Sequence, residues 1–217
     1  MLTKLKDKVQ EWISTEAKIM HKIGFKPNMV SGLGVAFGVF SGLAYWIAGA
    51  LQTYPSIHKA YLFIAVLSLF LSGFCDALDG ALARLYGETT LLGGFLDSLL
   101  DRYVDVAVLL GLILGGLCDL PWGLLALIGS LLTSYARARS EAAGIPMESI
   151  GIIERAERIL IIILASILNI VWADLPALNV GIIILAFGSN FTVIQRVIYF
   201  YRRTSSKNER FDEKLPS

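Results

Sequence analysis

Residues 29–51 read MVSGLGVAFGVFSGLAYWIAGAL and contain no charged side chain. A helix of about 20 apolar residues is long enough to cross the hydrocarbon core of a bilayer. This stretch therefore predicts a transmembrane helix. The whole chain agrees, because only 17% of its 217 residues are charged, whereas soluble domains carry about 25%. The net charge of +1 argues against a nucleic-acid binder, which normally has a basic domain.

Five further apolar runs follow this stretch. They are residues 60–75, 106–118, 120–136, 159–173 and 175–195. Together with residues 29–51 they predict an all-α integral membrane fold with six transmembrane helices. Gly34, Gly38 and Gly42 recur every four residues, a pattern that lets helices approach closely. Cys75 and Cys118 belong to no metal-binding motif and are interpreted as small apolar residues.

The two ends of the chain differ from this core. Between residues 3 and 23, apolar side chains gather on one helical face and charged ones on the other. The apolar set is Leu5, Val9, Trp12, Ile13, Ile19, Met20 and Ile23. We expect residues 1–26 to form an amphipathic helix at the membrane interface, with an ordinary surface helix as the alternative. We expect one membrane domain over residues 27–203 and a disordered cytoplasmic tail over residues 204–217.

Basic residues are distributed unevenly between the two sides of the predicted bundle. The breaks at residues 51–59, 118–121 and 173–176 contain almost none. The opposite connections hold Lys22, Lys26, Arg84, Arg137, Arg139, Arg155, Arg202 and Arg203. The positive-inside rule then places both termini in the cytoplasm of a multi-pass cell-membrane protein. Every charged helix end falls on that same side, which predicts a polar cavity, and hence an active site, open to the cytoplasm.

Four aspartates form the most informative group. Asp76 and Asp79 are three residues apart, and Asp97 and Asp101 are four apart, so each pair projects from one face of its helix. Four carboxylates near a membrane repel one another unless they are protonated or neutralised by cations. Hard oxygen ligands favour Mg²⁺, Mn²⁺ or Ca²⁺, and two such ions could stabilise a pyrophosphate. One alternative is that these acids pair with Arg84 and Arg102, and another is a proton-coupled transporter.

The segment DALDGALARLYGETTLLGGFLDSLLD, residues 76–101, resembles the signature of the CDP-alcohol phosphotransferase family, D-x2-D-G-x2-A-R-x8-G-x3-D-x3-D, at every fixed position. The resemblance implies an enzyme that transfers a lipid phosphate from a CDP-lipid to an alcohol and releases CMP. It also implies two metal ions, with Mg²⁺ expected and Mn²⁺ as an option, held by Asp76, Asp79, Asp97 and Asp101. Asp101 would in addition be the general base. The family further suggests a homodimer.

The same resemblance implies which residues bind the CDP-lipid. Asn28 and Ser31 lie in the sequence KPNMVS at the start of the first span, where helix capping is the alternative role. Small residues beside the acids leave room for a ligand, and Arg84 offers a cation for phosphate. The expected donor-binding set is Asn28, Ser31, Gly80, Ala83, Arg84, Thr90 and Gly93.

Cationic side chains outside the signature bear on the acceptor. They are Arg137, Arg139, Arg155, Arg158 and Arg196. Arginine suits phosphate recognition, so we expect a phosphorylated alcohol. The alternative is that some of these residues anchor the membrane or pair with Glu141, Glu154 and Glu157.

The segments SYARARSEAAG and GIIERAER resemble the family branch that uses inositol 1-phosphate, although Arg137 stands where lysine is commoner. The resemblance implies that Arg137, Arg155, Arg158 and Arg196 bind the acceptor phosphate. Glycerol 3-phosphate or another alcohol is the alternative acceptor, and a membrane transporter or a non-catalytic lipid-nucleotide binder is the alternative of another class.

Overall fold

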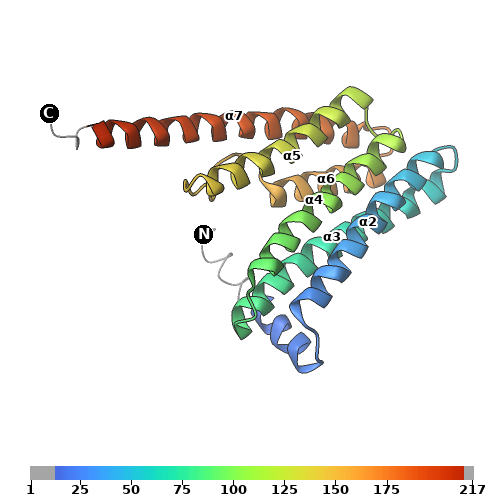
Figure 1. Ribbon diagram of the computed structural model, residues 1–217. Helices are drawn as coiled ribbons and strands as arrows, with labels where there is room; N and C mark the ends of the chain where they lie inside the picture. The colour runs from blue at the N-terminus through green and yellow to red at the C-terminus, as the bar shows by residue number, and fades with distance from the viewer. Residues whose placement is uncertain (1–12, 213–217) are drawn as a thin grey trace, which may run out of the picture. The chain divides into compact units, whose positions relative to one another are not determined.

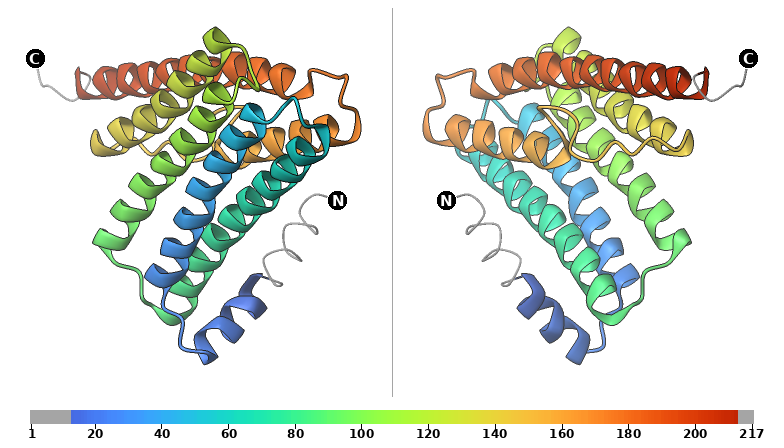
Figure 2. Two further views of the ribbon diagram at one scale, coloured as in Figure 1. Left: turned by 90° about the vertical axis from the view of Figure 1, so that its right-hand side faces the viewer. Right: turned by 90° about the vertical axis from the view of Figure 1, so that its left-hand side faces the viewer.

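The computed structural model describes residues 13–212, and the regular structure of this part of the chain is α-helical. The main helices are α2 (Pro27–Ala50), α3 (Pro55–Tyr86), α4 (Leu91–Leu114), α5 (Leu120–Ala142), α6 (Arg155–Val171) and α7 (Ala177–Asp212) (Figures 1 and 2). Residues 13–22 are also helical. The chain divides into two compact units, residues 1–117 and 118–217, and each is described by itself.

The helix boundaries follow simple local chemistry. Proline is the first residue of both α2 and α3, a position where its missing N–H costs nothing because that group has no partner inside the helix. Helix α3 ends at Gly87, whose φ of 67° is left-handed, a conformation that glycine adopts without steric cost. Thr90 caps α4 by accepting a hydrogen bond from the N–H of Gly93 at 2.9 Å.

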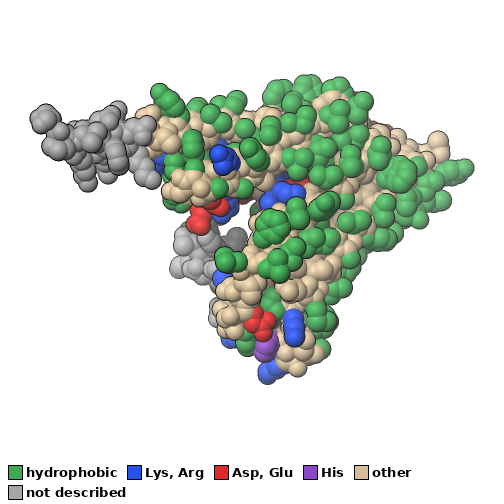
Figure 3. All heavy atoms as spheres, in the orientation of Figure 1, with side chains coloured by type: hydrophobic (Ala, Val, Ile, Leu, Met, Phe, Trp, Pro, Cys, Tyr) green, Lys and Arg blue, Asp and Glu red, His purple; other side chains and the backbone are tan. Residues whose placement is uncertain are grey.

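Three helices within residues 13–212 are long and apolar enough to cross a membrane: Pro27–Ala50, Pro55–Tyr86 and Ala177–Ser205. The outer faces of the helices expose large hydrophobic side chains, which are spread widely over the surface seen in Figure 3. Examples from α2, α3 and α7 are Phe40, Trp46, Phe63, Phe70, Phe187 and Phe191. Soluble monomers rarely expose so large an apolar surface, so the fold is that of a membrane protein.

The remaining three predicted spans coincide with helices that carry charge at one end. Helix α4 begins at Leu91 and includes Asp97 and Asp101 before its apolar part. Helix α5 ends in RARSEA, and α6 begins with RAER and has only 17 residues. These helices confirm the all-α class, whereas the count of six spans stays a prediction.

The glycine repeat of α2 is used for packing within the first unit, where α2 lies against both α3 and α4. A Cβ atom added at Gly34 would meet Cys75 and Ser72 of α3 at 3.0 and 3.4 Å. A Cβ added at Gly42 would collide with the backbone of Ala107 on α4. The same is true of Gly111, whose added Cβ would meet the backbone of Gly42. The predicted close helix approach is therefore confirmed, and it occurs inside the chain.

The N-terminal helical residues pack on this unit. Ala17 is fully buried in a cluster with Val30, Leu78 and Leu82, and Ile13 and Met20 pack against that cluster. Ile19 and Ile23 instead remain exposed. One part of the predicted apolar face is thus covered by protein and another part is available to a membrane. Leu5, Val9 and Trp12 lie outside the described residues.

In the second unit, α7 packs against α5 and α6. The amide of Asn190 on α7 donates to the carbonyl oxygen of Leu125 on α5 at 3.0 Å, beside Gly129, where a Cβ would collide with that amide. In the first turn of α7, the amide of Asn179 donates to the carboxylate of Asp119 at 2.8 Å. Polar side chains thus connect apolar helices, as expected where water is excluded.

Helix α7 continues through Asp212, beyond the boundary at residue 203 that the composition predicts. Residues 204–212 are therefore helical and differ from the disordered tail that was expected, while residues 213–217 lie outside the described part. The physical reason is cooperativity, because extending an existing helix costs far less than nucleating a new one. Low apolar content alone does not stop such an extension.

The substitution Gly42→Ala tests the contact between α2 and α4. We expect a lower apparent melting temperature in detergent, because overpacking costs about 1–3 kcal/mol and outweighs the roughly 0.5–1 kcal/mol that alanine gains over glycine in a helix. Gly32→Ala is the matched control, since a Cβ there meets no atom within 4 Å. Equal melting temperatures for the two variants would contradict the contact.

Candidate functional site

The predicted acidic residues converge in the first unit. One carboxylate oxygen from each of Asp76, Asp97 and Asp101 lies within 4.8 Å of the other two. Asp76 lies on α3, and the other two lie one turn apart on α4. The turn from Gly87 to Thr90 reverses the chain between them. All three side chains are partly buried, so their mutual repulsion is poorly screened by water.

This donor set fits a divalent metal ion. Three carboxylate oxygens at this separation can be ligands of one cation, and hard oxygen donors suit Mg²⁺, Mn²⁺ or Ca²⁺. A bound cation would also remove the repulsion among the acids. Divalent metal binding, expected from the spacing of the acids, is thus supported by their positions across two helices.

Asp79 occupies a different environment from the other acids. Its side chain is 7% exposed, and its carboxylate accepts a hydrogen bond from the hydroxyl of Ser31 on α2. The charges of Asp76 and Asp97 act on it, so it lies beside the three clustered acids without belonging to their group. Its role as a metal ligand stays a prediction.

Arg84 and Arg102 are the two arginines that the sequence analysis offered as partners of the acids. Arg102 approaches Asp101 with a closest N–O distance of 3.8 Å, while its Nη1 donates to the carbonyl oxygen of Ser98 at 2.8 Å. The pairing of Asp101 with Arg102 that the sequence left open therefore occurs, at long range. Arg84 is exposed and folds over Gly80, since a Cβ there would lie 3.1 Å from its Nη1. Glycine at position 80 leaves space for that guanidinium.

The residues expected to bind the CDP-lipid have observed local roles. Thr90 caps α4 through the N–H of Gly93, a role that the sequence analysis had not assigned to it. The N-cap of α2 is Lys26, and the hydroxyl of Ser31 donates either to Asp79 or to the carbonyl oxygen of Pro27 at 3.1 Å. Capping of α2 is thus not the function of Ser31 or Asn28. Ala83 lies on α3 one residue before Arg84.

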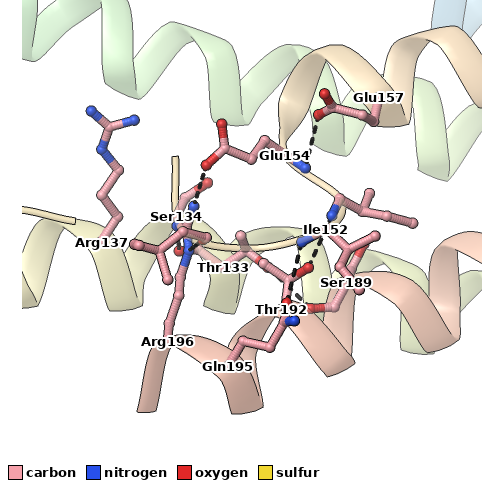
Figure 4. A network of polar contacts seen from close by, with 12 residues as sticks. Thr133, Ser134, Arg137, Ile152, Glu154, Glu157, Ser189, Thr192, Gln195 and Arg196 are labelled. Carbon is pink, nitrogen blue, oxygen red and sulfur yellow. Dashed lines mark hydrogen bonds and ion pairs between the residues drawn. The ribbon is translucent and has the colours of Figure 1, made fainter. Parts of the chain in front are cut away.

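The second unit contains a buried arginine that acts as a cross-link. Arg196 of α7 is 3% exposed, and its Nη2 pairs with Glu154 at 3.0 Å. Its Nη1 donates to the carbonyl oxygen of Thr133 at 2.6 Å and its Nε to that of Ile150 at 2.8 Å (Figure 4). Three of the five N–H groups of this guanidinium are thus used inside the protein. The pairing with Glu154 that the sequence left open is confirmed.

The other arginines of the predicted acceptor set lie on α5 and α6. Arg137 lies one turn after Thr133 on α5 and pairs with Glu141 at 2.8 Å. Arg155 is the first residue of α6, and Arg158 is 4% exposed on its next turn. The charges of Arg137 and Arg158 both act on Arg196. The fold therefore brings together a cationic group from α5, α6 and α7.

The sequence analysis assigned no role to two polar residues of α7 that bind the loop before α6. Thr192 accepts a hydrogen bond from the N–H of Ile153 at 3.1 Å, and Gln195 accepts one from Ile152 at 3.2 Å. With Arg196 they occupy positions i, i+3 and i+4 of one face of α7. That spacing is visible in the sequence, but the sequence does not show which loop these three residues bind.

Comparison with known proteins agrees with these observations. The model of the CDP-alcohol phosphatidyltransferase family matches residues 25–194. Archaetidylinositol phosphate synthase of Pyrococcus horikoshii is 36% identical over 197 residues, which cover 91% of this chain and 95% of that protein. Phosphatidylinositol phosphate synthase of Streptomyces avermitilis is 35% identical and covers 87% of this chain and 78% of its own length.

Solved structures give the same result. The crystal structure of phosphatidylinositol phosphate synthase from Mycobacterium tuberculosis with CDP-DAG bound has a TM-score of 0.72 and 30% identity, covering 87% of this chain and 93% of that chain. A second structure of that protein, in complex with manganese and citrate, has the same TM-score and identity and covers 87% and 88%.

These matches extend over most of the chain and include the segment that contains the four aspartates. These matches exclude the alternatives of a transporter and of a non-catalytic lipid-nucleotide binder, because the clustered acids occupy the positions of the transferase signature. The chain is a membrane enzyme that belongs to the CDP-alcohol phosphatidyltransferase family.

Proposed function

We propose that this enzyme transfers the phosphatidyl or archaetidyl group of a CDP-lipid to 1D-myo-inositol 3-phosphate, which is the same compound as L-myo-inositol 1-phosphate, and releases CMP. The observation that carries the reaction is the convergence of Asp76, Asp97 and Asp101. The relatives named as inositol phosphate synthases support this acceptor. The donor lipid, diacylglycerol or archaeol, differs among those relatives.

The acids have two roles in the proposed reaction. Asp76, Asp79, Asp97 and Asp101 hold two divalent ions, with Mg²⁺ preferred and Mn²⁺ able to replace it. When bound, such ions neutralise the charge on the pyrophosphate oxygens. Asp101 accepts the proton of the acceptor hydroxyl, whose oxygen forms a bond to the lipid-side phosphorus while the bond to the CMP oxygen breaks.

Residues around the acids bind the donor in this proposal. Arg84 pairs with a phosphate of the CDP-lipid, and the lack of a side chain at Gly80 lets the guanidinium reach it. Ser31 orients Asp79 through their hydrogen bond. The complete proposed donor set is Asn28, Ser31, Gly80, Ala83, Arg84, Thr90 and Gly93, with Thr90 and Gly93 acting through the start of α4.

The arginines of the second unit recognise the acceptor phosphate. Arg137, Arg155 and Arg158 supply N–H donors, which suit phosphate oxygens. Arg196 is the fourth member of this set and adds its positive charge, although three of its five N–H groups bind the protein. Glycerol 3-phosphate carries the same phosphate, and the acceptor assay below separates the two alcohols.

We further propose the arrangement that the sequence predicts in the membrane. Residues 1–26 form an interfacial helix, residues 27–203 a domain of six spans, and both termini and the active site face the cytoplasm. The uneven distribution of basic residues supports this orientation. A homodimer is proposed from the family alone, because the glycine repeat of α2 already packs inside the chain.

The acceptor is tested with purified protein, a CDP-lipid, Mg²⁺ and either inositol 1-phosphate or glycerol 3-phosphate. We expect CMP release and a labelled lipid product with inositol 1-phosphate, and at least about tenfold less with glycerol 3-phosphate. A difference of that size needs only about 1.4 kcal/mol of selective binding. Product with glycerol 3-phosphate alone would contradict the proposed acceptor and leave the reaction class intact.

Removal of metal tests the acidic cluster. Treatment with a chelator should abolish CMP release, and added Mg²⁺ or Mn²⁺ should restore it, because the cluster of Asp76, Asp97 and Asp101 needs cations to approach a pyrophosphate. Titration of Mn²⁺ against the apo protein, followed by electron paramagnetic resonance, would count the ions. A count of one would contradict the second site.

The substitution Asp101→Asn tests the base. It keeps the shape of the side chain but cannot accept the proton, so we expect kcat to fall by about 10²–10⁴ while the melting temperature in detergent changes little. Glu88→Gln is the control, because it removes an exposed acid outside the fixed positions of the signature. Activity of Asp101→Asn close to that of the control would exclude this role.

A further inference from the structure

The loop between α5 and α6 is fixed to one face of α7. The N–H of Ile152 donates to Gln195, and the N–H of Ile153 donates to Thr192. Gly151 has a φ of 134°, and a Cβ at that position would collide with Thr192. The two hydrogen bonds give partners to backbone N–H groups in a segment that has no regular structure, where no helix or strand would supply them.

Arg196 extends this attachment to the helices on either side of the loop. It binds the carbonyl oxygen of Thr133 on α5, that of Ile150 in the loop, and the carboxylate of Glu154. Thr133 lies one turn before Arg137, and Glu154 is the N-cap of α6, directly before Arg155 (Figure 4). One buried guanidinium therefore connects the two elements from which the other arginines project.

Glu154 is the acidic partner in this attachment. Its N–H donates to the carboxylate of Glu157 at 3.0 Å, which secures the first turn of α6, while its own carboxylate pairs with Arg196. The ion pair thus connects the first turn of α6, which the capping box secures, to α7. Because a buried arginine that loses its partner is strongly disfavoured, the pair holds this turn in one orientation.

We infer that Glu154 and Thr192 are positioning residues that set the acceptor affinity by fixing Arg196 and the start of α6 against α7. They act through Arg155, Arg158 and Arg196, and their effect falls on the acceptor and not on the CDP-lipid. This inference rests on the proposed function, in which those arginines bind the acceptor phosphate.

The experiment compares the full-length protein with Glu154→Gln and with Thr192→Val, a milder change that removes the partner of the Ile153 N–H. We expect KM for inositol 1-phosphate to rise about tenfold in Glu154→Gln, a loss typical of one charge-assisted hydrogen bond. KM for the CDP-lipid and kcat at saturating acceptor should stay within about twofold. Thr192→Val should show the same pattern with a smaller rise.

Glu148→Gln is the matched control, because it removes one negative charge from an exposed position of the same loop; it should leave both KM values unchanged. A fall in kcat together with a rise in both KM values for Glu154→Gln and Thr192→Val would show a merely structural role and overturn the inference. An unchanged acceptor KM in both variants would overturn it as well.

Hydrogen exchange separates this inference from the proposed function. The amides of Ile152 and Ile153 should exchange faster in Glu154→Gln and Thr192→Val than in the unmodified protein or in Glu148→Gln, whether or not the enzyme accepts inositol 1-phosphate. Unchanged exchange would overturn the attachment itself. Absence of activity in the unmodified protein with either phosphorylated alcohol, combined with faster exchange in the variants, would refute the proposed function and leave the attachment standing.

Discussion

The candidate metal site depends on the close approach of α2 to α4. The two backbones meet at Gly42 and Gly111, where neither helix has room for a Cβ atom. Helix α2 also packs along α3, so it holds the helix with Asp76 and the helix with Asp97 and Asp101. Polar carboxylates cannot draw themselves together, because they repel. Apolar and glycine-mediated packing has to hold the carboxylates close together. The packing thereby forms the site that a cation can bind.

In the second unit the repulsion is between positive charges. This unit gathers several arginines, which also repel, and buries two of them, Arg158 and Arg196. Arg196 is stabilised by Glu154 and by two backbone carbonyl oxygens, so its charge is compensated without a ligand. Arg137, Arg155 and Arg158 occupy the elements that Arg196 joins. A buried ion pair of this kind adds little net stability, but it fixes the orientation of the chain around it.

Several expectations from sequence could be made because helical periodicity is a local property. Spacings of three and four residues place Asp76 with Asp79, and Asp97 with Asp101, on one helical face each. The charge-free run of residues 29–51 needs only its length to predict a span. The end of a helix is harder to predict: α7 continues to Asp212 although residues 204–212 are mostly polar, because extending an existing helix costs little.

The sequence by itself determined the membrane class, the helical faces that carry the acids and the family. Only the tertiary structure decided that Asp76, Asp97 and Asp101 form the close group while Asp79 binds Ser31. It also decided that Arg196 is a cross-link, since Thr133, Ile150 and Glu154 are 63, 46 and 42 residues away in sequence. Periodicity orients side chains within one helix. Contacts between helices depend on how the helices pack, and no local sequence pattern specifies which residues meet across such large separations in sequence.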